Sequence, residues 1–315
     1  MPKKITIIGA GSVGATTAFA LLTRGAAAEI VLIDVNTEKA KGEALDINQA
    51  TPFIDNCEIY AGTYEDAVGS DVVIITSGIG RKPGQSRLEL VQTNVGIIKQ
   101  IASDIVKAAP NAIYILVANP VDILTYAFLK YTGLPKNQVF GTGTVLDTLR
   151  LRTRLAEIYN INKQQVHANV LGEHGDTSFV SWSTARISGV PLTEFNESIA
   201  TAYRIPNEYK REDVENYVRK SGGKIIQRKG CTVYGIAMTS TRIVTALAGS
   251  AETAMTISSL HQGEYGIDDV CTSSLTLLDH TGVRSIIIQN LTDEELKKHY
   301  ESAQTLKEVI KNVTF

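Results

Sequence analysis

The sequence predicts an α/β fold in which a doubly wound parallel sheet is followed by a C-terminal α+β domain. Apolar runs of strand length alternate with helical patterns between residues 3 and 159, as expected of a parallel sheet built from βαβ units. Beyond residue 166 short strands follow one another without that alternation. We therefore expect one domain over residues 1–142 and a second over residues 143–315.

Runs of apolar residues predict the strands, and apolar residues at helical spacing predict the helices. In the first domain the strands are expected at residues 3–8, 30–33, 58–61, 72–76, 112–117 and 139–141, and the helices at residues 15–22, 38–48, 88–109 and 123–131. In the second domain the strands are expected at residues 166–171, 185–187, 257–261, 270–278 and 282–288, and the helices at residues 146–159, 207–221, 232–254 and 293–311. Thr292 and Glu295 form a capping-box pattern at the start of the last helix.

The chain is organised around a glycine-rich turn between its first strand and its first helix. Gly9 permits the tight turn, Gly11 lets backbone N–H groups approach a pyrophosphate, and Gly14 lets helix and strand pack closely. Asp34 follows twenty residues after Gly14, at the carboxyl end of the second strand. A glycine-rich loop alone is a weak motif, but strand, helix, second strand and acid together are typical of a dinucleotide-binding Rossmann fold.

Asp34 also indicates which dinucleotide is bound. Its carboxylate would accept hydrogen bonds from the adenosine ribose and would repel a 2′-phosphate. No arginine follows it in residues 35–37. The expected cofactor is NAD rather than NADP.

Composition and charge restrict the classes of partner. The chain has 315 residues, of which 43% are hydrophobic, and its formal net charge is −2. This charge would not attract nucleic acid or an anionic membrane, and no apolar run approaches the roughly 20 residues that span a bilayer. Cys57, Cys231 and Cys271 are widely spaced, so we expect buried free thiols, no disulfide and no metal site. These features favour a cytoplasmic protein with small-molecule partners.

Two strand ends and one loop are expected near a ligand. Gly78 and Asn119 follow the fourth and fifth strands, so both should lie at the carboxyl edge of the sheet, where ligands bind. Residues 80–87 carry three cations and a Pro–Gly turn. A cationic lid and an ordinary solvated loop both remain open for this segment.

NAD chemistry on a small alcohol requires a group that exchanges the hydroxyl proton. The chain has five histidines, His167, His174, His261, His280 and His299. His174 is the strongest candidate because glycines stand close to it on both sides. Asp147 could hold its Nδ1–H, and Arg150 could grip a substrate carboxylate in a bidentate pair. A locally satisfied histidine and a simple Asp147–Arg150 ion pair are the alternatives.

Five motifs, in order and nearly end to end, carry a family resemblance. They are the glycine turn at residues 9–14, Lys-Pro-Gly at 82–84 with Arg87-Leu88, Asn-Pro-Val-Asp at 119–122, Leu-Asp-Thr-Leu-Arg at 146–150 and Gly-Glu-His-Gly-Asp-Thr at 172–177. Together they resemble the L-lactate/malate dehydrogenase family. The resemblance implies an NAD-dependent oxidoreductase that acts on a small 2-oxo or 2-hydroxy acid.

The resemblance also implies the roles of individual residues. His174 would be the proton donor and acceptor, Asp147 would orient it, Arg150 would bind the substrate carboxylate, and Arg87 would polarise the carbonyl. The further substrate-binding residues would be Arg81, Asn119 and Thr232. The cofactor-binding residues would be Gly9, Gly11, Val13, Gly14, Asp34, Lys39, Tyr64, Thr76, Gly78, Val117, Asn119 and Thr142.

The signals for the substrate conflict. Arg81 stands where malate-type enzymes of the family have an arginine that pairs with a second carboxylate and lactate-type enzymes typically have glutamine. Residues 87–91, 172–174 and 230–235 instead resemble the lactate type, and Gln85 could face the substrate if the loop shifts. We favour interconversion of pyruvate and L-lactate. Malate dehydrogenase is the alternative, other 2-oxo acids with larger side chains stay open, and a non-catalytic NAD-sensing protein is less favoured.

Regulation and assembly are implied by the resemblance alone. Arg152 and His167 resemble the residues that build a cationic site for fructose 1,6-bisphosphate across a subunit interface in bacterial lactate dehydrogenases. Plain surface charges are the alternative. The resemblance further implies a homo-oligomer, dimer or tetramer, with allosteric control and a place in fermentative glycolysis.

Overall fold

The computed structural model describes residues 4–54, 57–80, 87–199 and 209–315. In the first half of the chain, strands alternate with helices as the apolar spacing predicted. The strands are β1 (Lys4–Ile8), β2 (Glu29–Ile33), β3 (Glu58–Ala61), β4 (Val72–Ile75), β5 (Ile113–Leu116) and β6 (Val139–Gly141). The helices are α1 (Ser12–Thr23), α2 (Thr37–Asn48), α3 (Arg87–Ala108) and α4 (Val121–Thr132).

The second half contains long helices, short strands and one antiparallel group. The helices are α5 (Val145–Tyr159), α6 (Arg211–Lys229), α7 (Tyr234–Leu247) and α8 (Asp293–Lys311). The short strands are β7 (Val166–His167), β8 (Val170–Leu171), β9 (Phe179–Val180), β10 (Arg186–Ile187) and β11 (Val190–Pro191). The antiparallel group is β12 (Thr253–Gln262), β13 (Asp268–Asp279) and β14 (Gly282–Ile286).

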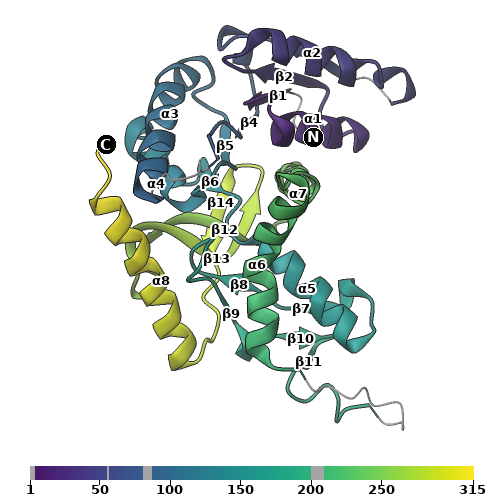
Figure 1. The fold of residues 1–315 in the computed structure, drawn as a ribbon, viewed down its shortest axis with the longest axis vertical. Helices are drawn as coiled ribbons and strands as arrows, with labels where there is room; N and C mark the ends of the chain where they lie inside the picture. Colours follow the sequence, from purple (N-terminus) through teal and green to yellow (C-terminus); the bar gives the residue numbers. More distant parts are fainter. Residues whose placement is uncertain (1–3, 55–56, 81–86, 200–208) are drawn as a thin grey trace.

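Within the described residues, nine strands form one sheet in the order β14-β13-β12-β6-β5-β4-β1-β2-β3 (Figure 1). The strands from β6 to β3 pair in parallel, and their order is that of a Rossmann fold. The antiparallel strands of the second half continue this sheet through the pair Ser258 and Gly141. The predicted fold class, a Rossmann sheet with a C-terminal α+β part, is confirmed.

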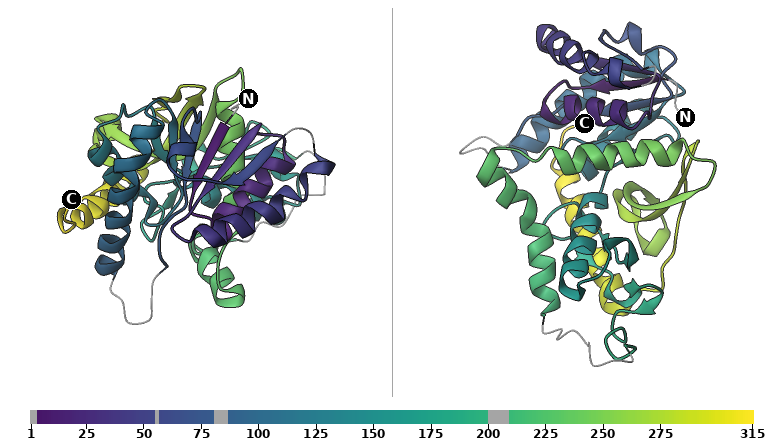
Figure 2. Two further views of the ribbon diagram at one scale, coloured as in Figure 1. Left: turned by 90° about the horizontal axis from the view of Figure 1, so that it is seen from above. Right: turned by 90° about the vertical axis from the view of Figure 1, so that its right-hand side faces the viewer.

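Both faces of the parallel sheet are covered because its strands are apolar on both sides. Along β4, Val73 and Ile75 belong to a core shared with α3 and α4, whereas Ile74 belongs to the opposite core, shared with α1, α2 and α7. Helix α7 runs beside α1 (Figure 2). This packing places the first turn of α1 and the start of α7 on the same side of the sheet.

Three of the elements in the second half differ clearly from the sequence predictions. The helix expected over residues 232–254 ends at Leu247, and Thr253 already begins β12; the Ala-Gly-Ser-Ala segment between them favours a turn over helix. The strand expected over residues 166–171 is two strands in two sheets. Helix α6 continues to Lys229 through a glycine pair, which propensity alone would place at a helix end. The predicted capping box of Thr292 and Glu295 is confirmed.

The thiol prediction was wrong at one position. Cys57 and Cys271 are buried, as expected, but Cys231 is exposed. It follows Gly230, whose φ of +87° ends α6 and turns the chain into a short connection toward α7. Among the helices in the described part of the chain, none has the length and hydrophobicity of a membrane span.

Candidate active site

The glycine turn between β1 and α1 has the close packing that its motif predicts. Gly9 has a φ of +105°, and a Cβ there would lie 2.6 Å from Thr76 Oγ1. A Cβ on Gly14 would lie 1.8 Å from the carbonyl oxygen of Gly9. Only glycine allows β1, α1 and β4 to meet this closely. Gly11 caps α1 without a side-chain hydrogen bond, so the first backbone N–H groups of the helix point toward a space suited to phosphate.

Asp34 is fixed beside this turn at the end of β2. Its Oδ2 accepts the backbone N–H of Ala10 at 2.7 Å, and its Oδ1 accepts that of Asn36 at 2.8 Å. Each carboxylate oxygen keeps a further lone pair for a ribose hydroxyl. The turn and Asp34 therefore fit the pyrophosphate and adenosine ribose of a dinucleotide.

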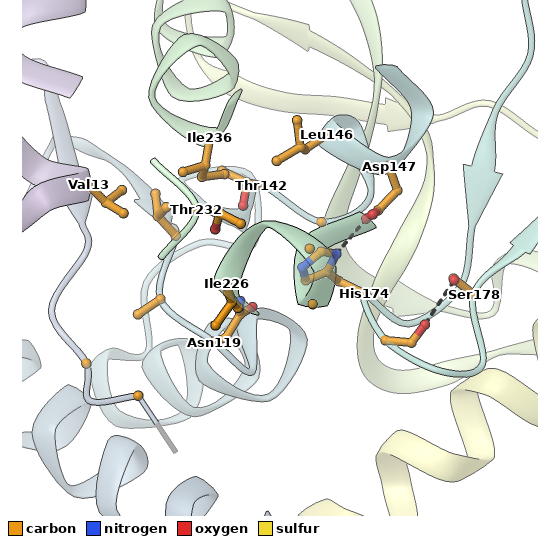
Figure 3. Close-up of a pocket in the computed structure, with 18 of the residues that line it drawn as sticks. Val13, Asn119, Thr142, Leu146, Asp147, His174, Ser178, Ile226, Thr232 and Ile236 are labelled. Atoms are coloured by element: carbon orange, nitrogen blue, oxygen red, sulfur yellow. Dashed lines mark hydrogen bonds and ion pairs between the residues drawn. The ribbon is translucent and has the colours of Figure 1, made fainter. Parts of the chain in front are cut away.

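A cleft of about 460 Å³ lies at the carboxyl edge of the parallel sheet. Its size is that of a small-molecule site. It is lined from α1, from the ends of β4, β5 and β6, and from α5, α6 and α7 (Figure 3). The predicted cofactor and substrate residues that line it are Val13, Thr76, Gly78, Val117, Asn119, Thr142, Asp147, Arg150, His174 and Thr232.

Three of these side chains form a connected group. Nδ1 of His174 lies 2.6 Å from Oδ2 of Asp147, and Oδ1 of Asp147 accepts Nη1 of Arg150 at 2.7 Å (Figure 3 shows the first contact). The carboxylate holds the proton on Nδ1, so Nε2 of the ring is the nitrogen left for a ligand. The side chain of His174 is 27% exposed and that of Asp147 is 8% exposed. A partly exposed imidazole is thus hydrogen-bonded to a buried carboxylate.

The charges around His174 hold its pKa near neutral pH. Burial alone would lower the pKa of His174, but the charge and hydrogen bond of Asp147, with a further contribution from Asp122, raise it to about 8. Burial would raise the pKa of the Asp147 carboxyl, yet His174 and Arg150 lower it. The ring can therefore both hold and release a proton near neutral pH, as acid–base chemistry requires.

Asn119 is held at the rim of the cleft by a residue that the sequence interpretation missed. Asn94 on α3 is buried, and its Nδ2 donates to the carbonyl oxygen of Asn119 at 2.8 Å. The same side chain exchanges hydrogen bonds with the backbone of Ile79, at 2.9 and 3.2 Å. Asn94 thus fastens the ends of β4 and β5 to each other.

One face of α6 was also missed. Arg219, Gly222, Gly223 and Ile226 line the cleft at helical spacing. Nη1 of Arg219 donates to the carbonyl oxygen of Ser178 at 2.8 Å. The i, i+3, i+4, i+7 pattern is visible in the sequence, but its two glycines gave it no apolar signal.

Several predicted cofactor residues lie away from the cleft. Gly9, Gly11 and Gly14 form the turn described above, and Asp34 lies beside it at the end of β2. Lys39 is exposed, and its backbone N–H caps α2 through Asn36. Tyr64 is half-buried and packs against the core beneath α3.

The two residues expected to bind an effector are close in the fold but differ in their surroundings. Arg152 donates from Nε to the carbonyl oxygen of Ala168 at 3.0 Å and from Nη2 to Oδ1 of Asn169 at 3.1 Å. His167 is exposed on β7. Arg81, Gln85 and the side chain of Arg87 lie outside the described residues.

Comparison with known proteins identifies the family that shares this architecture. Residues 3–141 match the model of the lactate/malate dehydrogenase NAD binding domain, and residues 144–315 match that of the lactate/malate dehydrogenase alpha/beta C-terminal domain. The chain belongs to the lactate/malate dehydrogenase family. Its N-terminal part is the NAD-binding domain of this family, as the glycine turn and Asp34 predicted.

Individual relatives in the lactate/malate dehydrogenase family cover the whole chain. The L-lactate dehydrogenase of Acetivibrio thermocellus is 42% identical over 99% of this chain and 97% of its own length. That of Thermoanaerobacterium saccharolyticum is 43% identical over 99% of both chains. The crystal structure of minor L-lactate dehydrogenase from Enterococcus mundtii is 38% identical, covers 99% of both chains and has a TM-score of 0.94.

Proposed function

We propose that the protein is an NAD-dependent L-lactate dehydrogenase that interconverts pyruvate and L-lactate. The observation that carries the proposal is the group His174, Asp147 and Arg150, which lines one cleft together with Val13 at the start of α1, next to the glycine turn. Relatives named L-lactate dehydrogenase, 42–43% identical over nearly the whole chain, support the choice of substrate.

The bound cofactor supplies or accepts the hydride. In pyruvate reduction, the guanidinium of Arg150 binds the substrate carboxylate, and the carbonyl oxygen points toward Nε2 of His174. The protonated ring gives its Nε2 proton to that oxygen, which completes the hydroxyl group of lactate. Asp147 keeps the proton on Nδ1 and stabilises the positive ring before the transfer. In lactate oxidation the neutral ring takes the hydroxyl proton back.

Other residues complete the proposed binding site. Asn119 would donate to the substrate oxygen at the rim, and Thr232 would line the substrate side of the cleft. Arg87 would polarise the carbonyl. We propose the division into residues 1–142 for NAD and residues 143–315 for substrate binding and catalysis. A cytoplasmic homo-oligomer, dimer or tetramer, is proposed with it.

Malate dehydrogenase remains the second candidate because of one sequence observation. Arg81 is a cation at the specificity position, and an unpaired guanidinium in a desolvated site would be costly unless a second carboxylate met it. A purely NAD-sensing protein is disfavoured, since sensing has no need of a histidine held on a buried carboxylate.

The test is steady-state NADH oxidation with pyruvate and with oxaloacetate, each with and without fructose 1,6-bisphosphate. We expect a higher kcat/KM for pyruvate, since the ratio of these constants defines specificity. A higher value for oxaloacetate would assign Arg81 to a second carboxylate and would replace the lactate proposal with malate. Stimulation by the bisphosphate that is lost in Arg152→Ala would support an effector site at Arg152 and His167.

A further inference from the structure

A second carboxylate lies behind His174, and the chemistry above does not use it. Asp122 is the second residue of α4 and is 2% exposed. Its Oδ2 accepts the backbone N–H of His174 at 2.8 Å. This contact joins the start of α4 to the loop of His174, 52 residues later in the chain.

The hydrogen bond does not explain why this residue is an acid. A neutral side-chain oxygen would accept the same N–H group without the cost of burying a charge. Burial raises the pKa of Asp122 to about 6, against the opposing effects of Ser258 and of His174. The carboxylate is therefore ionised above about pH 6, and the first turn of α4 favours its negative charge.

The charged side chains that act on His174 come from two helices. Asp147 and Arg150 lie on α5, and Asp122 lies on α4. Glu173, which precedes His174 in the chain, acts instead on Asp122, whose pKa it raises. Asp147 and Asp122 favour the protonated ring, and Arg150 opposes it. Cys271 of β13 is a neutral thiol, since burial, and after it the charge of Asp122, raises its pKa well above the usual range.

We propose that Asp122 is a positioning residue for His174, which holds the backbone of the histidine and uses its buried charge to favour the protonated ring. The residue acts through His174 and does not touch the substrate. Asp122 also belongs to the segment that presents Asn119, so the start of α4 sets the distance between the substrate-facing amide and the proton donor. This inference rests on the function proposed above.

The sign of the effect provides a sharp test. Asp122→Asn keeps an oxygen for the His174 N–H group and removes the charge, so the pKa of His174 should fall by about 0.5 to 1 unit. Pyruvate reduction needs the protonated ring, so its kcat/KM should fall about three- to tenfold at pH 9 and stay within about twofold at pH 6. Lactate oxidation needs the neutral ring, so its kcat/KM at pH 6.5 should rise about three- to tenfold.

A measurement without substrate or cofactor keeps the test independent of turnover. The rate at which diethyl pyrocarbonate modifies His174, followed by mass spectrometry against pH, reports the neutral fraction of that ring. Asp122→Ser is the second neutral variant, and both should show the same lower pKa even if their thermal stabilities differ. Asp269→Asn is the matched control. Asp269 lies on β13 and pairs with Lys130 of α4, the helix that carries Asp122. The φ of +46° at Asp269 suits asparagine.

The outcomes separate this inference from the proposed function. Equal losses in both directions at every pH, with an unchanged modification profile, would reduce Asp122 to a structural contact and overturn the proposal. The same conclusion would follow if neither neutral variant folded. If the unaltered protein turned over neither pyruvate nor oxaloacetate, the proposed function would fail, while the modification profiles would still decide whether Asp122 acts on His174.

Discussion

The chemistry of single residues in this site depends on which of their atoms are already engaged. Nδ1 of His174 and Oδ2 of Asp147 are committed to each other, which leaves Nε2 for a substrate oxygen. Arg150 contacts Oδ1 of Asp147 through Nη1, and a Cβ on Gly222 would lie 3.8 Å from its Nη2. The missing side chain at Gly222 therefore leaves room beside the guanidinium for a carboxylate.

At this scale we expect His174→Asn to separate binding from chemistry. NADH binding, followed by fluorescence titration, should be retained because the glycine turn and Asp34 are untouched. The kcat for pyruvate reduction should fall by about 10³-fold, since asparagine cannot donate a proton in place of imidazolium. His280→Asn, at an exposed histidine, is the control and should keep full activity. Retained turnover in His174→Asn would assign the proton to another group.

At the scale of elements, the cleft is lined by the ends of strands and helices rather than by their middle parts. The carboxyl ends of β4, β5 and β6 and the first turns of α1, α5 and α7 line the cleft at one edge of the sheet, which is where open parallel sheets bind ligands. Helix α6 is the exception, because it offers the middle of its length. Two glycines there weaken the helix and widen the cleft at the same time.

The glycines of α6 provide a prediction about the stability of that element. Gly223 has helical backbone angles, and a Cβ there would meet nothing within 4 Å. Gly223→Ala should raise the free energy of unfolding by about 1 kcal/mol, measured by urea denaturation. The contrasting variant is Gly230→Ala at the end of the same helix, where φ is +87°. It should destabilise by about 1 kcal/mol, and a stabilising effect there would contradict this account of the helix end.

At the scale of the whole molecule, the two parts share one sheet and a buried polar layer. The sheet runs from β3 to β14 without interruption, so the second part begins as an extension of the Rossmann sheet. Helix α8 packs on the antiparallel strands, where Nε2 of His261 lies 2.8 Å and Nε2 of His299 lies 3.4 Å from the Ser274 hydroxyl. Both rings are fully buried, which makes them neutral members of the core.

Because the buried ring of His299 is neutral, we expect the protein to lose stability in acid. Burial, with a smaller effect of His261, lowers the pKa of His299 to about 3. In the unfolded chain the ring titrates near 6.5, so the stabilising contribution of the neutral ring is complete above pH 6.5 and declines as the pH falls toward 3. Protonation of the His299 ring in the unfolded chain should lower the free energy of unfolding by about 2 kcal/mol between pH 6.5 and pH 5.

The measurement is urea unfolding of the unaltered protein and of His299→Gln at pH 7 and pH 5. The variant has no ring to protonate at this position, so its free energy of unfolding should fall by about 2 kcal/mol less than that of the unaltered protein between pH 7 and pH 5. His280→Gln removes an exposed ring and is the control. If the unaltered protein and His299→Gln lost stability equally, the buried ring would not be the source of the acid sensitivity.

The sequence by itself determined the fold class and the NAD cofactor, and it singled out the candidates for acid–base chemistry. These depend on local patterns: alternation of apolar residues for the strands, a turn that only glycine can make at Gly9 and Gly14, and an acid at the end of β2. The pairing of His174 with Asp147, 27 residues earlier, could be inferred because few side chains in the chain can do acid–base work. The face of α6 that lines the cleft was not recognised, since Gly222 and Gly223 carry no side chain that marks it.

Only the tertiary structure decided which distant groups share one environment. The contact of Asp122 with the His174 backbone, the bridge of Asn94 to Asn119, and the exposure of Cys231 all depend on how elements pack. The length of α6 belongs to the same class, because the helix continues through a glycine pair whose propensity alone would end it. Burial and electrostatic coupling are properties of three-dimensional neighbours, and local sequence patterns do not specify them.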